Sequence, residues 1–321
     1  MHTRRLKILA TGLGVMAALY FGVCWQVLKI LITPERRLGD IPTTETLGVE
    51  TIDSLSFKSL TDETSLKGWF VPNSPERVII VLHGLHSYAW NCGSTDLAKT
   101  YAKAGFSVFL FDQRGHGQSG GEHLGLGLLE KGDVQAAVNL LLKKGFRPGD
   151  IGIHGSSYGA AVTLLATEDI AEIGAIVADS AFASMDDVVS GELKRQTGLP
   201  PIVSQLLMPG LSLVGEIQYG VDITQSTPEQ SIGQISPRPI LLIHGEQDLV
   251  IPYEHAQRLQ KAAGNNVELW TLPTKHVEGI RLSDNCRLAP MRNNFLAKVS
   301  QFFDTHLVTS DSAKAPVLHQ P

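Results

Sequence analysis

Residues 150–167 read DIGIHGSSYGAAVTLLAT, and this stretch decides the fold. The apolar run at 150–154 is typical of a buried strand, and the small and apolar residues after Tyr158 favour a helix packed closely on a sheet. Between them lies G-x-S-x-G, in which flanking glycines let a strand and a helix approach while a serine sits on the strained turn. The sequence therefore predicts a strand, a sharp turn at Ser157 and a helix whose first N–H groups face the serine.

The rest of the chain repeats this alternation of strand and helix. Apolar runs that end in glycine, such as RVIIVLHG at 77–84, suit strands buried on both faces. The predicted strands are 65–72, 77–84, 107–112, 150–155, 173–180, 238–245 and 267–273. The predicted helices are 96–105, 127–145, 158–167, 253–264 and 289–307. This order predicts an α/β fold with a mostly parallel central sheet and helices on both faces.

Three segments depart from the alternation. Residues 182–236 contain no strand pattern, and their apolar stretch LPPIVSQLLMPG is interrupted by prolines, so we expect a small helical cap over the site. Residues 33–48 are rich in turn formers and are interpreted as a linker. Residues 309–321 are interpreted as a disordered tail, which leaves 49–308 as the catalytic domain.

A second G-x-S-x-G occurs at 117–121, GQSGG, around Ser119. It follows the loop DQRGHG and precedes more glycines, so neither a strand nor a helix flanks it. Ser156 is excluded because it occupies a variable position of the first motif. With glycine at 31 of 321 positions the pattern also arises by chance, so the context decides, and it favours Ser157 as the nucleophile.

A serine nucleophile needs a base, and the base needs an acid that orients it. Asp248 follows the predicted strand 238–245, and His276 follows the strand 267–273. Both come after the carboxyl ends of strands, where open α/β sheets place their sites. The order Ser157, Asp248, His276 matches the order nucleophile, acid, base. Asp179, near the end of the predicted strand 173–180, is the alternative to Asp248 as the acid of the triad.

These residues together resemble the α/β-hydrolase superfamily over about residues 50–308, close to its monoacylglycerol-lipase-like and prolyl-oligopeptidase-like branches. The resemblance rests on His83-Gly84, DQRGHGQSGG, GSSYG, HGEQDLVIP and KHVEG. It implies a bacterial serine hydrolase without a cofactor, with the N–H groups of Leu85 and Tyr158 as oxyanion hole. It also implies that the glycine-rich loop around Ser119 is structural. We expect cleavage of carboxylic esters; a peptidase or amidase of the same fold is the alternative, followed by a non-catalytic binding module.

Composition and cysteine count argue against several other classes of protein and site. A net charge of −5 and the lack of a basic stripe in the body of the chain give no support for nucleic-acid binding. Three cysteines without C-x-x-C spacing exclude a disulfide framework; we expect Cys92 and Cys286 as separate thiols, with a bridge between them as the alternative. His83 and His86 lack a third ligand for a metal. His154 and His244 are expected to be structural, and His255 to be solvated.

The N-terminus is the most apolar part of the chain. No charge interrupts residues 8–28, and Arg4, Arg5 and Lys7 precede them. The run is longer than the apolar part of a signal peptide and lacks a small-x-small cleavage site, so we expect residues 1–32 to be an uncleaved membrane anchor. Lys29, Arg36 and Arg37 follow the run, so the basic flanks nearly balance. The free amine and the tight first cluster favour an inside N-terminus and a body on the non-cytoplasmic side. A small or lipid-like ester is the expected substrate, and the oligomeric state stays open.

Overall fold

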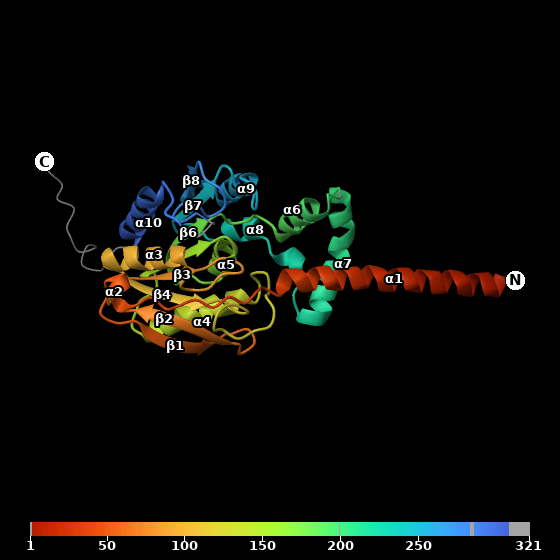
Figure 1. Cartoon of the computed structure of the whole chain (residues 1–321), viewed down its shortest axis with the longest axis horizontal. Helices are drawn as coiled ribbons and strands as arrows, with labels where there is room; N and C mark the ends of the chain where they lie inside the picture. Colours follow the sequence, from red (N-terminus) through yellow and green to blue (C-terminus); the bar gives the residue numbers. More distant parts are fainter. Residues whose placement is uncertain (1, 199, 283–285, 308–321) are drawn as a thin grey trace.

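The computed structural model describes residues 2–198, 200–282 and 286–307, and in this part eight strands form one sheet in the order β1-β2-β4-β3-β5-β6-β7-β8 (Figure 1). All neighbours from β4 to β8 are parallel, while β2 is antiparallel to β1 and β4. The strands are β1 Asp53–Lys58, β2 Ser65–Val71, β3 Val78–Leu82, β4 Ser107–Asp112, β5 Ile151–Ser156, β6 Ile173–Asp179, β7 Ile240–Gly245 and β8 Val267–Leu272. The predicted mostly parallel sheet is confirmed. β1 was not predicted, because it is a polar edge strand, DSLSFK, without a buried run.

Helices cover both faces of the sheet, as the alternation predicts (Figure 1). Neighbouring residues of one strand point to opposite faces, so Ile80 belongs to one hydrophobic core and Ile79 to the other. α4, α5, α8 and α9 contribute to the first core, and α3 and α10 to the second. The helices of the body are α2 Thr44–Leu47, α3 Cys92–Lys103, α4 Glu130–Lys143, α5 Tyr158–Thr167, α8 Pro228–Ile232, α9 Glu254–Ala263 and α10 Arg292–His306.

The predicted helical cap is present between β6 and β7. It contains α6 Met185–Thr197 and α7 Pro201–Tyr219, followed by a short 3-10 turn at Ile223–Gln225 and then α8. Pro209 lies inside α7 and cannot donate a helical hydrogen bond. α6 and α7 stand away from the sheet, beside α1 (Figure 1).

The N-terminal helix α1, His2–Ile32, projects from the body (Figure 1). Among the described residues it is the one helix long and apolar enough to cross a membrane, with a mean hydropathy of 1.9 over an 18-residue window. By this measure α1 is a candidate span or a signal sequence. Only its C-terminal part, from Tyr20 onward, packs on the protein: Cys24, Leu28 and Ile32 are buried, and the contacts are mainly with α7.

The segment after α1 is held firmly on the body. The Ile32 carbonyl accepts a hydrogen bond from Leu124 N at 2.8 Å. The Arg36 guanidinium donates to the carbonyls of Gly117 and Gly121 at 2.9 and 3.0 Å, and also to those of His116 and Ser119. The predicted linker 33–48 is therefore docked on the glycine-rich loop, and it includes α2. The predicted tail, 309–321, lies outside the described residues.

Candidate active site

Ser157 occupies the turn between β5 and α5, as the motif predicts. Its backbone has φ 54° and ψ −119°, a conformation that costs a non-glycine residue energy and is common at functional sites. Close packing fixes the turn from both sides. A Cβ on Gly155 would lie 2.2 Å from the Gly159 carbonyl oxygen, and one on Gly159 would lie 2.5 Å from the His83 carbonyl oxygen. The two motif glycines are thus required by contact distances.

The structure brings the three residues of the predicted triad together. His276 Nε2 lies 2.7 Å from Ser157 Oγ, and His276 Nδ1 lies 2.7 Å from an Asp248 carboxylate oxygen. If Nδ1 carries the proton and donates it to Asp248, then Nε2 is free to accept the proton of the serine hydroxyl. This is the geometry required of a nucleophile, its base and the acid that orients the base.

Burial and backbone hydrogen bonds fix the carboxylate of Asp248 in place. Its side chain is fully buried, and its second oxygen accepts hydrogen bonds from Val250 N at 2.9 Å and Ile251 N at 2.8 Å. His244 Nε2 lies 3.6 Å from the oxygen that faces His276, and donates to the Ile251 carbonyl at 2.8 Å. A carboxylate with fixed acceptor geometry keeps the imidazole of His276 in one orientation.

Asp179, the competing acid, has another place. Its carbonyl oxygen accepts the Ser157 N–H at 2.7 Å, and its carboxylate accepts the Ser180 hydroxyl at 3.1 Å. The hydrogen bond of His276 Nδ1 goes to Asp248 instead. Burial raises the pKa of Asp179 to about 7, an effect partly opposed by the nearby His276 and the Ser180 hydrogen bond. The Ser180 Oγ also accepts the Val277 N–H at 3.4 Å, which links this carboxyl to the His276 loop.

The loop after β3 faces the nucleophile. A Cβ on Gly84 would lie 3.2 Å from Ser157 Cβ, so the loop backbone runs directly past the serine. His83 holds the loop: its Nε2 accepts Gln113 N–H at 3.1 Å, and its Nδ1 donates to the Gly84 carbonyl at 2.8 Å. Burial lowers the pKa of His83 to about 4, so the ring stays neutral and keeps this pattern. Leu85 follows in the same loop, and Tyr158 N begins α5, the two positions predicted to hold an oxyanion.

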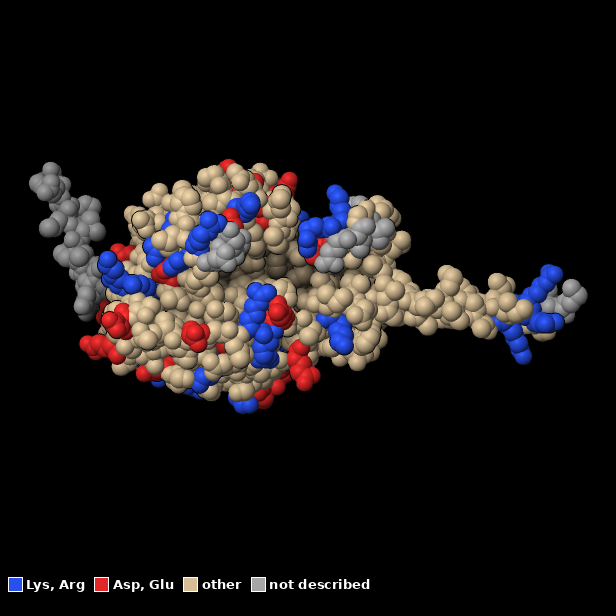
Figure 2. All heavy atoms as spheres, viewed as in Figure 1, with Lys and Arg blue, Asp and Glu red and all other residues tan. Residues whose placement is uncertain are grey.

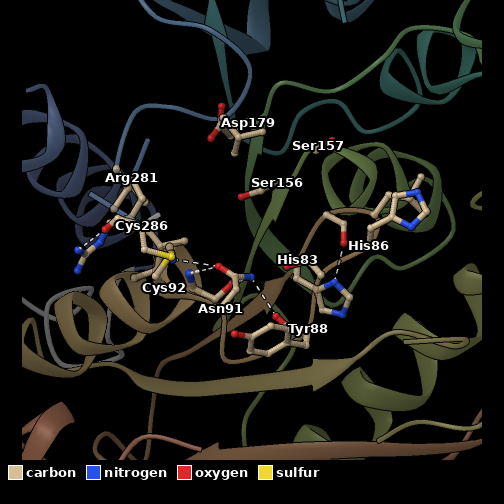
Figure 3. Close-up of a pocket in the computed structure, with 18 of the residues that line it drawn as sticks. His83, His86, Tyr88, Asn91, Cys92, Ser156, Ser157, Asp179, Arg281 and Cys286 are labelled. Atoms are coloured by element: carbon tan, nitrogen blue, oxygen red, sulfur yellow. Dashed lines mark hydrogen bonds between the residues drawn. A yellow bond between two sulfur atoms is a disulfide. The ribbon is translucent and has the colours of Figure 1, made fainter. Parts of the chain in front are cut away.

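Ser119, in the second G-x-S-x-G, is a structural residue. It is buried, donates its hydroxyl proton to the Asp112 carbonyl and accepts Lys67 N–H at 2.9 Å. It does not line the pocket at Ser157. Ser156, by contrast, does line this pocket next to the nucleophile, with its side chain pointing into it (Figure 3).

A pocket of about 490 Å³ opens over Ser157. Leu85, Leu97 and Ile280 give it an apolar wall, and Arg37 and Arg281 lie among its polar residues. None of the described lining residues comes from the cap, which therefore lies beside the pocket instead of over it. Arg37 was not recognised from the sequence, because only the docking of the linker brings it here. Figure 2 shows the surface hollowed between the body and the cap.

A disulfide closes one side of the pocket (Figure 3). Cys92 begins α3, Cys286 follows the His276 loop, and their Cα atoms are 6.1 Å apart. The prediction of two separate thiols is wrong, because 194 residues separate the pair and only the folded sheet brings α3 beside that loop. Arg281 strengthens the same contact, with its Nε 2.6 Å from Asp96 of α3.

Two further histidines, His255 and His154, are structural. The prediction that His255 is solvated is wrong: it is buried, and its Nδ1 accepts Ala183 N–H at 3.1 Å, because α9 packs its histidine face against the chain leading into the cap. His154 lies 2.6 Å from the Tyr101 hydroxyl, and burial lowers the pKa of His154 to about 3. Within the described ranges no three metal-ligating side chains gather, so the structure offers no candidate metal centre there.

The chain is similar in sequence to known proteins. Residues 73–213 match the family model described as "Serine aminopeptidase, S33". The Bacillus subtilis protein YqkD is 33% identical over 197 residues, which cover 60% of this chain and 63% of YqkD. The chain thus matches less than two thirds of the length of YqkD. The Escherichia coli protein YfhR is 29% identical over 225 residues, covering 68% of this chain and 71% of YfhR.

Solved structures of similar fold include two with informative names. The Pyrococcus furiosus esterase Pf2001 is 25% identical, with a TM-score of 0.69 over 86% of this chain and all of its own. A putative dipeptidyl aminopeptidase IV from Bacteroides ovatus is 17% identical, with a TM-score of 0.58 over 80% of this chain and 36% of its own. The second likeness shows the fold alone.

Proposed function

We propose, from the α/β-hydrolase fold of this chain, that it is a serine hydrolase that cleaves carboxylic esters through Ser157, His276 and Asp248. One observation carries the proposal: the hydrogen-bonded chain from Ser157 Oγ through His276 to Asp248, with both distances 2.7 Å, at the floor of a pocket. The likeness to an esterase over that protein's whole length supports an ester substrate.

In the proposed mechanism His276 Nε2 takes the Ser157 proton as the serine oxygen attacks the ester carbonyl. The N–H groups of Leu85 and Tyr158 donate to the oxygen that becomes negative. His276 then protonates the departing alcohol, which leaves an acyl group on Ser157. A water molecule, deprotonated by the same histidine, releases the acid. Asp248 stabilises the imidazolium in both halves of the reaction, and no cofactor is required.

The test compares two serines in matching motifs. Full-length protein in detergent micelles is assayed with p-nitrophenyl butyrate and labelled with a fluorophosphonate probe. Ser157→Ala is expected to lower kcat by at least about a thousandfold and to abolish labelling. Ser119→Ala, the control from GQSGG, is expected to keep the label while losing about 1–3 kcal/mol of stability from two broken buried hydrogen bonds. A folded Ser157→Ala protein with wild-type rates would refute the mechanism.

A peptidase or amidase is the second candidate, since residues 73–213 match a serine aminopeptidase family. The same triad can attack an amide. Rates on alanyl p-nitroanilide and p-nitrophenyl butyrate, measured with one preparation, separate the two. A higher kcat/KM for the anilide would favour the peptidase.

We also propose that α1 is retained as an anchor. Cys24, Leu28 and Ile32 are buried, so cleavage after the apolar run would expose the cap surface that they cover. The Cys92–Cys286 disulfide favours an oxidising compartment, and therefore a body on the non-cytoplasmic side. The proposed membrane anchor and the apolar wall of the pocket together lead us to propose a lipid-like ester as the substrate. An alkaline phosphatase reporter fused after α10 should be active in bacteria; an inactive reporter would reverse the orientation.

A further inference from the structure

The cap helix α7 carries an exposed apolar stripe. Ile202, Leu206, Leu213 and Ile217 are 54%, 64%, 44% and 75% exposed. Their spacings of four, seven and four residues return to one side of an α-helix. An exposed row of large aliphatic side chains on a cap that does not line the pocket needs another explanation.

α7 is fixed across the body end of α1. The Tyr20 hydroxyl donates to the Leu206 carbonyl at 2.8 Å and accepts Gly210 N–H at 3.0 Å, so it bridges the helix where Pro209 interrupts it. Gly210 permits this approach, because a Cβ there would lie 2.5 Å from Cys24 Sγ. The crossing of the two helices is therefore locked by side-chain contacts (Figure 1).

The stripe faces the direction in which α1 leaves the protein. On the opposite side of α7, Gly215 faces Leu28, which is near the body end of α1. Leu213 and Ile217 instead share a hollow with Phe21, which is nearer the free end. Since α7 lies across α1 in Figure 1, a membrane crossed by α1 would run along α7.

The positions of the lysines that flank the apolar part of α1 indicate how deep α7 would lie in a membrane crossed by α1. Lys7 and Lys29 are 22 residues apart, which at 1.5 Å per residue is about 33 Å, close to the thickness of a bilayer core. The contact at Cys24 comes five residues before Lys29, about 7.5 Å inside that boundary. Amphipathic helices that lie in a membrane surface are buried by about 5–10 Å.

The charge of α7 fits such a position. The helix has no lysine or arginine, and its one acid, Glu216, is exposed at an edge of the stripe beside the helix end. In Figure 2 the shaft of α1 between its basic N-terminal end and the cap shows no charged residue, whereas blue residues mark the cap itself. The apolar surface of α1 thus continues into that of α7 through Phe21.

We propose that the stripe Ile202, Leu206, Leu213 and Ile217 is a second membrane contact, which lies in the interfacial layer of a lipid bilayer next to α1 and holds the hydrolase body at a fixed height. This inference rests on the proposed anchoring by α1. It assigns the cap the role of a membrane-binding element.

The experiment measures depth without using activity. Full-length protein is reconstituted into vesicles of equal parts phosphatidylcholine and phosphatidylglycerol, and an environment-sensitive fluorophore is attached to single engineered cysteines. Native thiols interfere little, because Cys24 is buried and Cys92 and Cys286 are bonded. Leu206→Cys and Ile217→Cys report on the stripe, and quenching is measured with lipids that carry a nitroxide near the headgroup.

Two further sites make the outcomes distinct. Leu13→Cys reports on α1, and Lys103→Cys, at the end of α3 on the part of the body far from α1, is the aqueous control (Figure 1). The proposal expects severalfold quenching at 13, 206 and 217 and none at 103. Quenching at 13 without quenching at 206 and 217 overturns it and leaves the anchor intact; no quenching at 13 refutes the anchor itself. Disulfide crosslinking of Ile217→Cys between two copies in dilute vesicles would also overturn it, by assigning the stripe to a dimer.

Discussion

Removal of the Cys92–Cys286 bridge should cost the protein much stability and little activity. The bridge closes a loop of 194 residues, and the chain entropy that such a crosslink removes from the unfolded state corresponds to about 5 kcal/mol at 25 °C. Whole domains are stable by only about 5–15 kcal/mol, so this loss is a large fraction of the total. The active-site geometry has a second support, because Arg281 and Arg292 both pair with Asp96 of α3 and hold the same segment. We therefore expect kcat to fall only a few-fold.

The assay is urea denaturation in detergent, with oxidised wild type compared with the double variant Cys92→Ser/Cys286→Ser. The midpoint should fall strongly in the variant, and dithiothreitol should lower the wild-type midpoint to the same value while leaving the variant unchanged. The reductant-insensitive variant thereby controls for effects of dithiothreitol on the detergent. Equal free energies of unfolding within about 1 kcal/mol for oxidised wild type and variant would refute the entropy reasoning.

Three further predictions concern the core of the site. Burial raises the pKa of Asp179 from 3.8 to about 7, so the folded state favours the protonated carboxyl. The free energy of unfolding of the wild type should therefore fall by up to about 4 kcal/mol, relative to that of Asp179→Asn, as the pH rises from about 4 to 7. Denaturation of both proteins at pH 4 and pH 7 measures this, and the same stability difference at both pH values would contradict it. Gly155→Ala, whose Cβ would lie 2.2 Å from the Gly159 carbonyl oxygen, should lower stability by at least about 3 kcal/mol, whereas Gly191→Ala, with open space around it, should be neutral or stabilising in the same Tm measurement. Arg36→Ala should cost about 2 kcal/mol and speed proteolysis of the linker; an unchanged cleavage rate would show that the clamp does not hold it.

The sequence predicts the parts of this molecule that local patterns determine. Strands buried on both faces, such as 77–84, stand out as unbroken apolar runs, and the parallel sheet then places Ser157, Asp248 and His276 at one edge. β1 escapes prediction because an exposed edge strand needs no apolar run. The distances among Ser157, His276 and Asp248 are consistent with these predictions.

What the sequence does not predict depends on contacts between distant segments. His255 sits on a helix whose buried face is set by the chain before the cap, and no periodicity in the helix reveals that neighbour. The disulfide joins two loops that meet only after the sheet has formed. Arg37 reaches the pocket because its neighbour Arg36 binds four carbonyls of the glycine-rich loop, and a pattern rich in turn formers gives no sign of this.

The docking of the linker on the body affects how a membrane-bound substrate would reach the pocket. A flexible tether would let the body move freely above a membrane, but here each step from α1 to the pocket is bonded. Ile32 ends α1 and accepts Leu124 N–H, Arg36 binds the glycine-rich loop, and Glu35 N donates to His86 of the pocket at 3.1 Å. α7 is also hydrogen-bonded to Tyr20 and Cys24, so α1 is joined to the cap as well as to the body. If α1 anchors the protein as proposed, these contacts hold the pocket at a constant distance from the membrane plane, and an ester in the bilayer must travel to reach Ser157. Substrates that can leave the membrane surface by a short distance should therefore be hydrolysed faster than equally reactive esters held deep within it.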